Sequence, residues 1–352
     1  MFGFGRSKSV VGLDIGSSAV KAVELRRAGK GHAVVRVAVA PVPPDAIVDG
    51  AIIDGGAVAD AIRSLFAGKK FSTPQVAVSL SGNSVIVKKI SLPPMTEAEL
   101  ADSIRWEAEQ YIPFDIQDVN LDYQILDAGA GTEKGAMDVL LVAAKKEKIA
   151  DYTGVIVRAG CVPLVVDVDA FALQNAWEAN YGLDANAVVV LINAGASAVN
   201  INIVCGSQSL FTRDISLGGN AYTEALQREL NLPFATAELA KKGYPVDGVS
   251  FDDVRPVLHA MTENVLLEIQ KSFDFFKATA VSDRIDRIFL SGGASSVDGF
   301  AKALEQRFEA PVEVFDPFNK IALDANYEIA SRELASTVAV AVGLALRKAG
   351  ER

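Results

Sequence analysis

Two stretches of the sequence resemble each other: VGLDIGSSAVKAVEL at residues 11–25 and VLINAGASAVNINIV at residues 190–204. At a constant offset of 190 − 11 = 179 residues, five of the fifteen positions are identical. Each copy consists of an apolar run, a turn of small residues centred on glycine, and a second, alternating run. This pattern is typical of a β-hairpin. The sequence therefore predicts a chain of two halves that contain related hairpins.

The turns of both hairpins have the composition of phosphate-binding turns. A turn of glycine and serine exposes backbone N–H groups with little side-chain cover, and such groups bind phosphate oxygens. In the first copy Asp14 lies at the entrance of the turn, where a carboxylate can hold water of a hydrated Mg²⁺, and Lys21 follows on the return strand. The alternative is two unrelated hairpins whose glycines only make the turn, and the hairpins alone do not decide between the two.

Two further stretches bear on a nucleotide site. Residues 288–299, IFLSGGASSVDG, predict a strand, a pair of glycines, and a helix that opens over residues 294–297. A glycine pair lets a flat ring approach the backbone closely, although such turns also serve plain packing. Residues 234–242 predict a helix with charges on one face, for which a solvated salt bridge is the simpler interpretation in isolation.

Composition limits the classes of function. A chain of 352 residues suggests two or more domains, and a net charge of −10 argues against nucleic-acid binding, which needs a basic face. Two cysteines cannot form a disulfide framework, so a reducing, intracellular compartment is expected. No apolar run reaches the roughly 18–20 residues of a membrane-spanning helix, and the first residues do not have the pattern of a secretory signal.

The order of these features resembles the actin-like ATPase superfamily and, within it, the PilM family of cytoplasmic type IV pilus assembly proteins. The resemblance extends over nearly the whole chain and includes SLPPMTEAEL (91–100), EAEQYIPFD (107–115), VDVDAFAL (166–173), SLGGNAYTEAL (216–226) and IFLSGGASSVDGF (288–300). It implies an α/β fold of the actin-like, or ribonuclease H-like, type. Two duplicated domains and an inserted subdomain of the kind found in FtsA and PilM are expected.

The resemblance and the element pattern together imply four structural units. The first actin-like domain is expected to comprise residues 1–82, 164–184 and 331–352, with a peptide-docking subdomain inserted at 83–163. The second domain is expected at 185–218 and 282–330, with a helical nucleotide-covering subdomain at 219–281. Within the insert, Thr96 and Glu99 have capping-box spacing, so a helix is expected to begin at Thr96 and to end before Pro113.

Carried over position by position, the resemblance implies ATP and Mg²⁺ as cofactors and assigns roles to individual residues. The first phosphate loop is matched by Gly16, Ser17, Ser18 and Lys21, with Asp14 as a metal ligand through water, and the second by Asn193, Gly195, Ala196 and Ser197. Glu238 with Lys241 or Lys242 matches the residues that hold the ribose and flank the adenine, and Gly292 and Gly293 match the adenosine turn. Asp169 occupies the catalytic position near the metal and the attacking water.

One position departs from the superfamily pattern. The second loop of the superfamily normally begins with Asp, and Asn193 stands there in this chain. A neutral amide cannot supply the negative charge that helps to hold hydrated Mg²⁺ and to orient the nucleophilic water. Backbone N–H groups still bind phosphate, so the sequence predicts nucleotide binding and, at most, a slow ATPase.

Two hypotheses of function follow. The first is an ATP-binding adaptor that docks the cytoplasmic tail of a PilN-like protein and reaches the cytoplasmic face of the inner membrane only through that partner. The alternative is an FtsA-like, filament-forming ATPase. Such proteins carry an amphipathic membrane helix after a C-terminal linker, whereas this sequence ends in AVGLALRKAGER, which favours the adaptor. Self-association is left open by both hypotheses.

Overall fold

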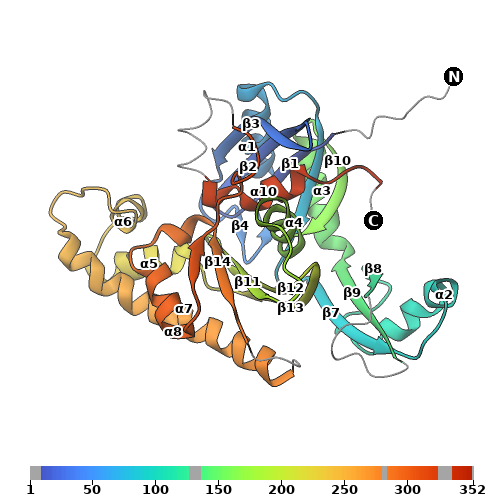
Figure 1. Ribbon diagram of the computed structural model, residues 1–352. Helices are drawn as coiled ribbons and strands as arrows, with labels where there is room; N and C mark the ends of the chain where they lie inside the picture. The colour runs from blue at the N-terminus through green and yellow to red at the C-terminus, as the bar shows by residue number, and fades with distance from the viewer. Residues whose placement is uncertain (1–8, 127–135, 280–283, 324–334, 351–352) are drawn as a thin grey trace.

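The computed structural model describes residues 9–126, 136–279, 284–323 and 335–350. Two five-stranded sheets form its framework (Figure 1). The first has the order β10–β6–β1–β2–β3, with bounds β1 Val11–Ile15, β2 Ala19–Ala28, β3 Gly31–Pro41, β6 Gln75–Leu80 and β10 Val162–Val168. The second has the order β15–β14–β11–β12–β13, with bounds β11 Val188–Ala194, β12 Val199–Cys205, β13 Gln208–Ile215, β14 Arg287–Ser291 and β15 Val312–Val314.

The predicted duplication is confirmed at the level of hydrogen-bonding register. Asp14 lies opposite Lys21 in the first hairpin, and Asn193 lies opposite Asn200 in the second, each 179 residues further on (193 − 14 and 200 − 21). The two turns close in the same way, because the N–H of Gly16 donates to the carbonyl of Ala19 at 3.1 Å and that of Gly195 to Ala198 at 2.8 Å. Both sheets therefore have one topology, with strands parallel on one side of the hairpin and antiparallel on the other.

Two helices lie between the sheets and join the halves. α4 (Asp169–Tyr181) and α10 (Ala339–Ala345) pack in one core with apolar residues from both sheets, Val23 and Leu191 among them (Figure 1). The helices cross closely at Gly343, where a β-carbon would lie 1.6 Å from the carbonyl oxygen of Ala172. The small-residue pattern of the last helix is thus explained by helix–helix contact.

The opposite face of the first sheet is covered by α1 (Gly55–Lys69) and α3 (Lys146–Arg158), and the short strands β4 (Ile47–Val48) and β5 (Ala51–Ile52) precede α1. On α3, Tyr152 and Ile156 are buried in the core of this sheet. The sequence placed residues 83–163, and therefore α3, in the insert. In the structure α3 packs on α1 and β10 and also contacts β9 (Met137–Lys145).

The inserted elements form a small layer of their own, which lies apart from the helices α5–α7 in Figure 1. Its sheet has the order β7–β9–β8, with bounds β7 Val85–Leu92, β8 Val119–Ile125 and β9 Met137–Lys145. Helix α2 (Glu97–Ala108) packs on this sheet through Leu100 and Ile104. As predicted, the helix is capped by Thr96, whose hydroxyl accepts from the N–H of Glu99 at 3.3 Å while Glu99 accepts from the N–H of Thr96 at 2.7 Å.

The second half carries the helices α5 (Gly219–Leu230), α6 (Phe234–Lys241), α7 (Phe251–Thr279) and α8 (Phe300–Phe308). A helix was expected to open at residues 294–297. The structure has a single 3₁₀ turn there, η1 (Gly293–Ser296), and α8 begins only at Phe300, because glycines with positive φ at 292 and 299 enclose the short segment. A second 3₁₀ turn, η2, covers Ala335–Thr337. Among the described residues, no helix is long and apolar enough to span a membrane.

Candidate functional site

The two predicted phosphate loops meet at the junction of the two halves. The hydroxyl of Ser17, in the first turn, donates a hydrogen bond to the hydroxyl of Ser197, in the second turn, at 3.0 Å. These residues are 180 positions apart in the sequence. The hairpins of the two halves therefore present their turns to one another, and polar groups of both turns can reach one ligand.

The first turn contains an ion pair. Nζ of Lys21 lies 2.9 Å from Oδ2 of Asp14, and the two side chains are only 16% and 15% exposed. The segment between them, residues 15–20, contains the turn residues Gly16, Ser17 and Ser18, and the carbonyl of Ser18 accepts from the N–H of Val42 at 2.9 Å. Lys21 thus compensates the charge of Asp14 within the protein itself.

The second turn replaces this ion pair by amides. Nδ2 of Asn193 donates to Oδ1 of Asn200 at 3.0 Å, and Nδ2 of Asn200 donates in turn to Oδ1 of Asp214 at 2.7 Å. The other carboxylate oxygen of Asp214 accepts from the backbone N–H of Gly82, in the segment that connects β6 to the inserted β7. We call this set, Asn193, Asn200, Asp214 and Gly82, the amide chain. It connects the second phosphate loop with the root of the insert.

Asp169 begins α4 close to both turns. The Ser79 hydroxyl, at the end of β6, donates to its carboxylate. Burial raises the pKa of Asp169 to about 6, and the nearby charges of Asp14 and Asp214 add to the rise, although hydrogen bonds from Ser79 and Ser81 oppose it. Asp14 from the first half and Asp214 from the second therefore both repel the charge of Asp169, which favours a cation near Asp169. Within the described residues, no three or more His, Cys, Asp or Glu side chains are arranged as metal ligands.

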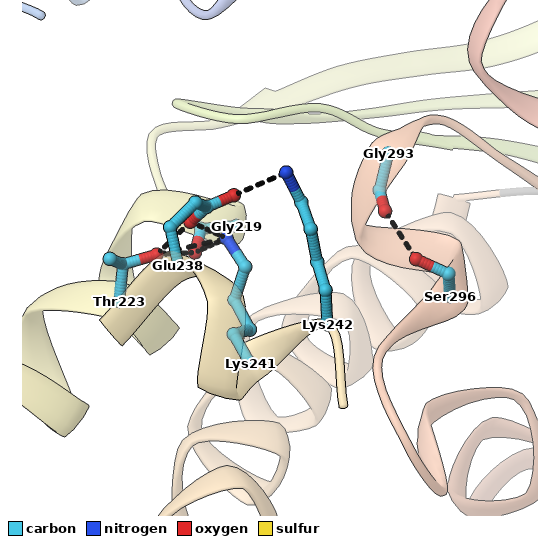
Figure 2. Close-up of polar contacts among 7 residues, drawn as sticks. All are labelled: Gly219, Thr223, Glu238, Lys241, Lys242, Gly293 and Ser296. Carbon is cyan, nitrogen blue, oxygen red and sulfur yellow. Dashed lines mark hydrogen bonds and ion pairs between the residues drawn. The ribbon is translucent and has the colours of Figure 1, made fainter. Parts of the chain in front are cut away.

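Glu238 and Lys241 form a network that ties α6 to the start of α5 (Figure 2). Nζ of Lys241 lies 2.6 Å from Glu238 and donates to the Gly219 carbonyl at 3.0 Å and to the Thr223 hydroxyl at 2.9 Å. Burial lowers the pKa of Lys241, whereas its charge and that of Lys242 hold the pKa of Glu238 below the usual value against the effect of burial.

This network reaches the second phosphate loop directly. The N–H of Gly219 donates to the carbonyl of Gly195 at 2.9 Å, and the N–H of Asn220 donates to the carbonyl of Ala196 at 2.7 Å. The start of α5 is therefore fixed on the turn. Lys241, 8% exposed, has its donors engaged inside the protein, so it acts as a positioning residue in this structure.

Lys242 is placed differently from Lys241. Its side chain is 53% exposed and lies 3.3 Å from Glu238. Figure 2 shows it between Glu238 and the Gly293–Ser296 turn. Sequence reasoning left open which of the two lysines faces a nucleoside, and the exposed position of Lys242 beside the glycine turn favours Lys242.

The two glycines of the predicted adenosine turn have different surroundings. Gly292 has φ of +89°, and a β-carbon there would lie 2.3 Å from the carbonyl oxygen of Ala194 and 2.7 Å from Oδ1 of Asn193. At Gly293 a β-carbon would meet no atom within 4 Å. Gly292 thus lets β14 approach the second phosphate loop, and Gly293 leaves open space beside it.

The structure adds three residues that sequence reasoning missed: Ser79, Lys148 and Asp214. Lys148 is buried, donates to the Gly50 carbonyl, and has its pKa lowered by burial, which the charge of Asp169 opposes. Nothing in the local pattern distinguishes Ser79 or Lys148. Asp214 had a weak signal, because it lies opposite Asn200 on the strand that extends the second hairpin.

Solved structures with the same architecture define the class of the protein. The chain superposes on the archaeal actin homolog Ta0583 with a TM-score of 0.51 and 12% identity, covering 96% of this chain and 98% of that one. For MreB5 of Spiroplasma citri bound to ADP the TM-score is 0.51 with 14% identity, over 96% and 95% of the two chains. The fold is therefore actin-like, duplicated and two-halved, as the sequence predicted.

Closer similarity identifies the family. The family model described as type IV pilus assembly protein PilM matches residues 12–349. A solved structure of a PilM–PilN type IV pilus biogenesis complex contains a chain that is 31% identical, with a TM-score of 0.83 over 97% of this chain and 99% of that one. The chain belongs to the PilM family of type IV pilus assembly proteins.

Proposed function

We propose that this protein is the ATP-binding adaptor of a type IV pilus assembly platform and docks the cytoplasmic tail of a PilN-like inner-membrane protein. The observation that carries the proposal is the 31% identity, along 97% of the chain, to a protein solved as a PilM–PilN complex. The alternative, an FtsA-like filament-forming ATPase, is not favoured, because the similarity to the chain of the PilM–PilN complex is far greater than that to MreB5, at 14% identity. On this proposal the protein is cytoplasmic and reaches the membrane through its partner.

ATP with Mg²⁺ fits the residues at the junction of the halves. The backbones of residues 16–18 and 195–197 would hold the phosphates, and the open space at Gly293 beside Lys242 would admit the nucleoside, as MreB5 was solved with ADP. Mg²⁺ usually keeps several waters and binds through one or two carboxylates plus phosphate. Asp14 and Asp169 suit that outer role, and burial together with the charge of Asp14 raises the pKa of Asp169.

Hydrolysis is expected to be slow. A general base works best when its pKa lies near the operating pH, and Asp169, with a pKa of about 6, meets this condition. Asn193 lacks the charge that the superfamily places at the start of the second loop, and its amide is engaged with Asn200. The bound metal would supply stabilisation of phosphate charge, and Lys21 would contribute to it from the first turn.

The insert offers a place for the partner's tail. A hollow of about 440 Å³ at its base is lined by Phe114, Asp115, Asp118, Lys145, Lys146 and Glu147. Trp106, on α2, is 72% exposed. The exposed Trp106, and the hollow in which the half-buried Phe114 lies beside charged groups of both signs, suit a peptide with apolar anchors and basic or acidic neighbours. The tail is therefore proposed to dock on the insert.

The amide chain gives the nucleotide a route to this docking place. Asn193 lies at the second phosphate loop, and Asp214 accepts from Gly82 at the root of the insert, where β13 also contacts β7. A ligand that displaces the Asn193 amide changes the hydrogen bonds along the amide chain. Tail affinity is therefore expected to differ between the ATP-bound and the nucleotide-free protein.

Two titrations test the proposal. ATP with Mg²⁺ should raise the melting temperature, since a ligand that binds only the folded state stabilises it by RT ln(1 + [L]/Kd). A synthetic tail of the PilN-like partner should bind the wild type and bind the Phe114→Ala variant more weakly, with a tail of scrambled sequence as the control. If the folded protein shows no thermal shift at millimolar ATP, the proposed nucleotide binding is wrong. If the native tail and the scrambled tail bind equally, the proposed docking of the partner's tail is wrong.

A further inference from the structure

A second hollow lies far from the candidate nucleotide site. Its volume is about 530 Å³, and it is bounded by the distal ends of β2 and β3, the last turns of α4 and the residues after α10. Arg27 and His32, which lie opposite each other in the β2–β3 register, form one wall. Arg27 is six residues beyond Lys21 along β2, which corresponds to about 20 Å of strand. None of the predicted site residues lines this hollow.

The hollow concentrates positive charge in an acidic protein. Arg27, Arg347 and Lys348 line it together with one carboxylate, Glu178, and Arg347 also pairs with the buried carboxylate of Asp167. With both carboxylates counted, the local charge is 3 − 2 = +1 with His32 neutral. Glu178 accepts from Nε2 of Gln174 at 2.8 Å. The whole chain carries a net charge of −10, so this local excess is opposite in sign to the protein around it.

One nitrogen donor at the hollow is buried without an acceptor. In the described part of the chain, Nδ2 of Asn175 has no hydrogen-bond partner, whereas Nε of Arg347 faces Oδ2 of Asp167 at 3.4 Å. Folded proteins satisfy nearly all of their buried donors. An unsatisfied donor that lines a cationic hollow points to an acceptor from outside the chain.

We propose that this hollow is a binding site for a small molecule that carries a phosphate group, separate from the ATP site. The volume falls within the usual range for small-molecule sites, about 300–1,000 Å³. Arginine forks match phosphate geometry and give charge-assisted hydrogen bonds. A phosphate group, which is negatively charged, complements the local charge of +1 and supplies an acceptor for Nδ2 of Asn175. The free inorganic ion and a phosphate ester both supply this group, and the experiment below separates these sources.

His32 makes the site observable. Burial lowers the pKa of His32, and the charges of Arg27 and Lys348 lower it further. The other charged groups at the hollow are Glu178 on α4 and Arg347 after α10. A bound anion favours the imidazolium form, so phosphate binding raises the pKa of His32. The protein has one other histidine, His259, which is exposed on α7 and serves as an internal reference.

The experiment follows the imidazole resonances of both histidines by NMR in the full chain. Inorganic phosphate, glycerol 3-phosphate and sodium chloride are titrated at matched ionic strength, with and without ATP and Mg²⁺. We expect both phosphates to shift the His32 resonance saturably, to raise its pKa, and to leave His259 unchanged. Tighter binding of the ester assigns the site to a phosphorylated metabolite, and equal binding assigns it to the phosphate group alone.

Two neighbouring arginines provide matched variants. Arg27→Gln should weaken phosphate binding by at least about tenfold, as expected for the loss of one charge-assisted contact. Arg26→Gln removes the same charge from the same strand, but Arg26 does not line the hollow, so its affinity should stay within about twofold of wild type. A His32 response to chloride equal to that with phosphate, or equal losses in both variants, overturns the proposal.

Discussion

The two hairpins share one backbone register but carry their charged side chains on different strands. In the first, Asp14 and Lys21 face each other as an ion pair, and Val39 lies opposite Lys21 on the third strand. In the second, Asn193 and Asn200 face each other as amides, and the carboxylate is on the third strand, at Asp214. Duplication has preserved the register while the charged residues have moved between strands.

This difference separates what each turn can do. Lys21 can turn from Asp14 to a phosphate, so the first turn responds to a ligand through charge. The second turn has no ion pair between its hairpin strands, and it communicates through hydrogen bonds that end at Gly82, beside the insert. The first hairpin is thus suited to binding and the second to reporting that binding.

The largest effect is expected at Gly292, where the halves differ in backbone. In the first half Leu13 pairs with Val78, and in the second half the equivalent residue, Ile192, pairs with Leu290. Leu80 and Gly292, each two residues further along the chain, are therefore at equivalent positions. Gly292→Ala should lower the free energy of unfolding by at least about 3 kcal/mol, because positive φ and overpacking both oppose it. Urea unfolding measures this. Gly293→Ala, with open space around the new β-carbon, should cost less than about 1 kcal/mol, and equal losses would refute the packing argument.

Asp169 should give the next largest effect, and a dependence on pH. Its pKa rises from 3.8 to about 6 on folding, so the folded state binds the proton more tightly. Stability from this group is therefore present below about pH 4 and is lost as the pH rises through 6. The free energy of unfolding of Asp169→Asn should exceed that of the wild type by about 3 kcal/mol at pH 8 and by little at pH 4. Urea unfolding across this range measures the difference, and a difference that does not change with pH would show that folding does not raise the pKa of Asp169.

Asn193→Asp restores a carboxylate to the second hairpin. Its ATP turnover should rise by about tenfold over that of the wild type, since preorganised charge at the phosphate is commonly worth that much or more. Without Mg²⁺ the variant should lose about 1 kcal/mol of stability, because Asp14, Asp169 and Asp214 already crowd the region. Phosphate release is the measurement, with Asn200→Asp as the control that places the charge one strand away. Wild-type turnover near ~1–10 s⁻¹ would show that the amide does not limit hydrolysis.

Local pattern explains what the sequence predicted and where it was wrong. The hairpins and the Thr96 cap were predicted because their signals lie within a few residues of one another. A pattern that predicts burial for a helix does not identify the sheet that covers it, so the packing of α3 on α1 and β10 could not be predicted from residues 83–163 alone. Asp214 and Gly82 were missed because their relation depends on two segments 132 residues apart. The roles of the candidate site residues stay predictions.

The smallest effect concerns the contact between the two turns. In the free protein the Ser17–Ser197 hydrogen bond should contribute a coupling of about 0.5 kcal/mol, measured by a double-mutant cycle of the two serine-to-alanine variants in urea unfolding. Ser18 provides the control, because it is the position that the repeat equates with Ser197 but its side chain is exposed, so Ser18→Ala and Ser197→Ala should be additive. With saturating ATP and Mg²⁺ the Ser17–Ser197 coupling should fall toward zero, since phosphate oxygens then compete for both hydroxyls. A coupling that ATP leaves unchanged would mean that the two turns hold each other and not a shared ligand.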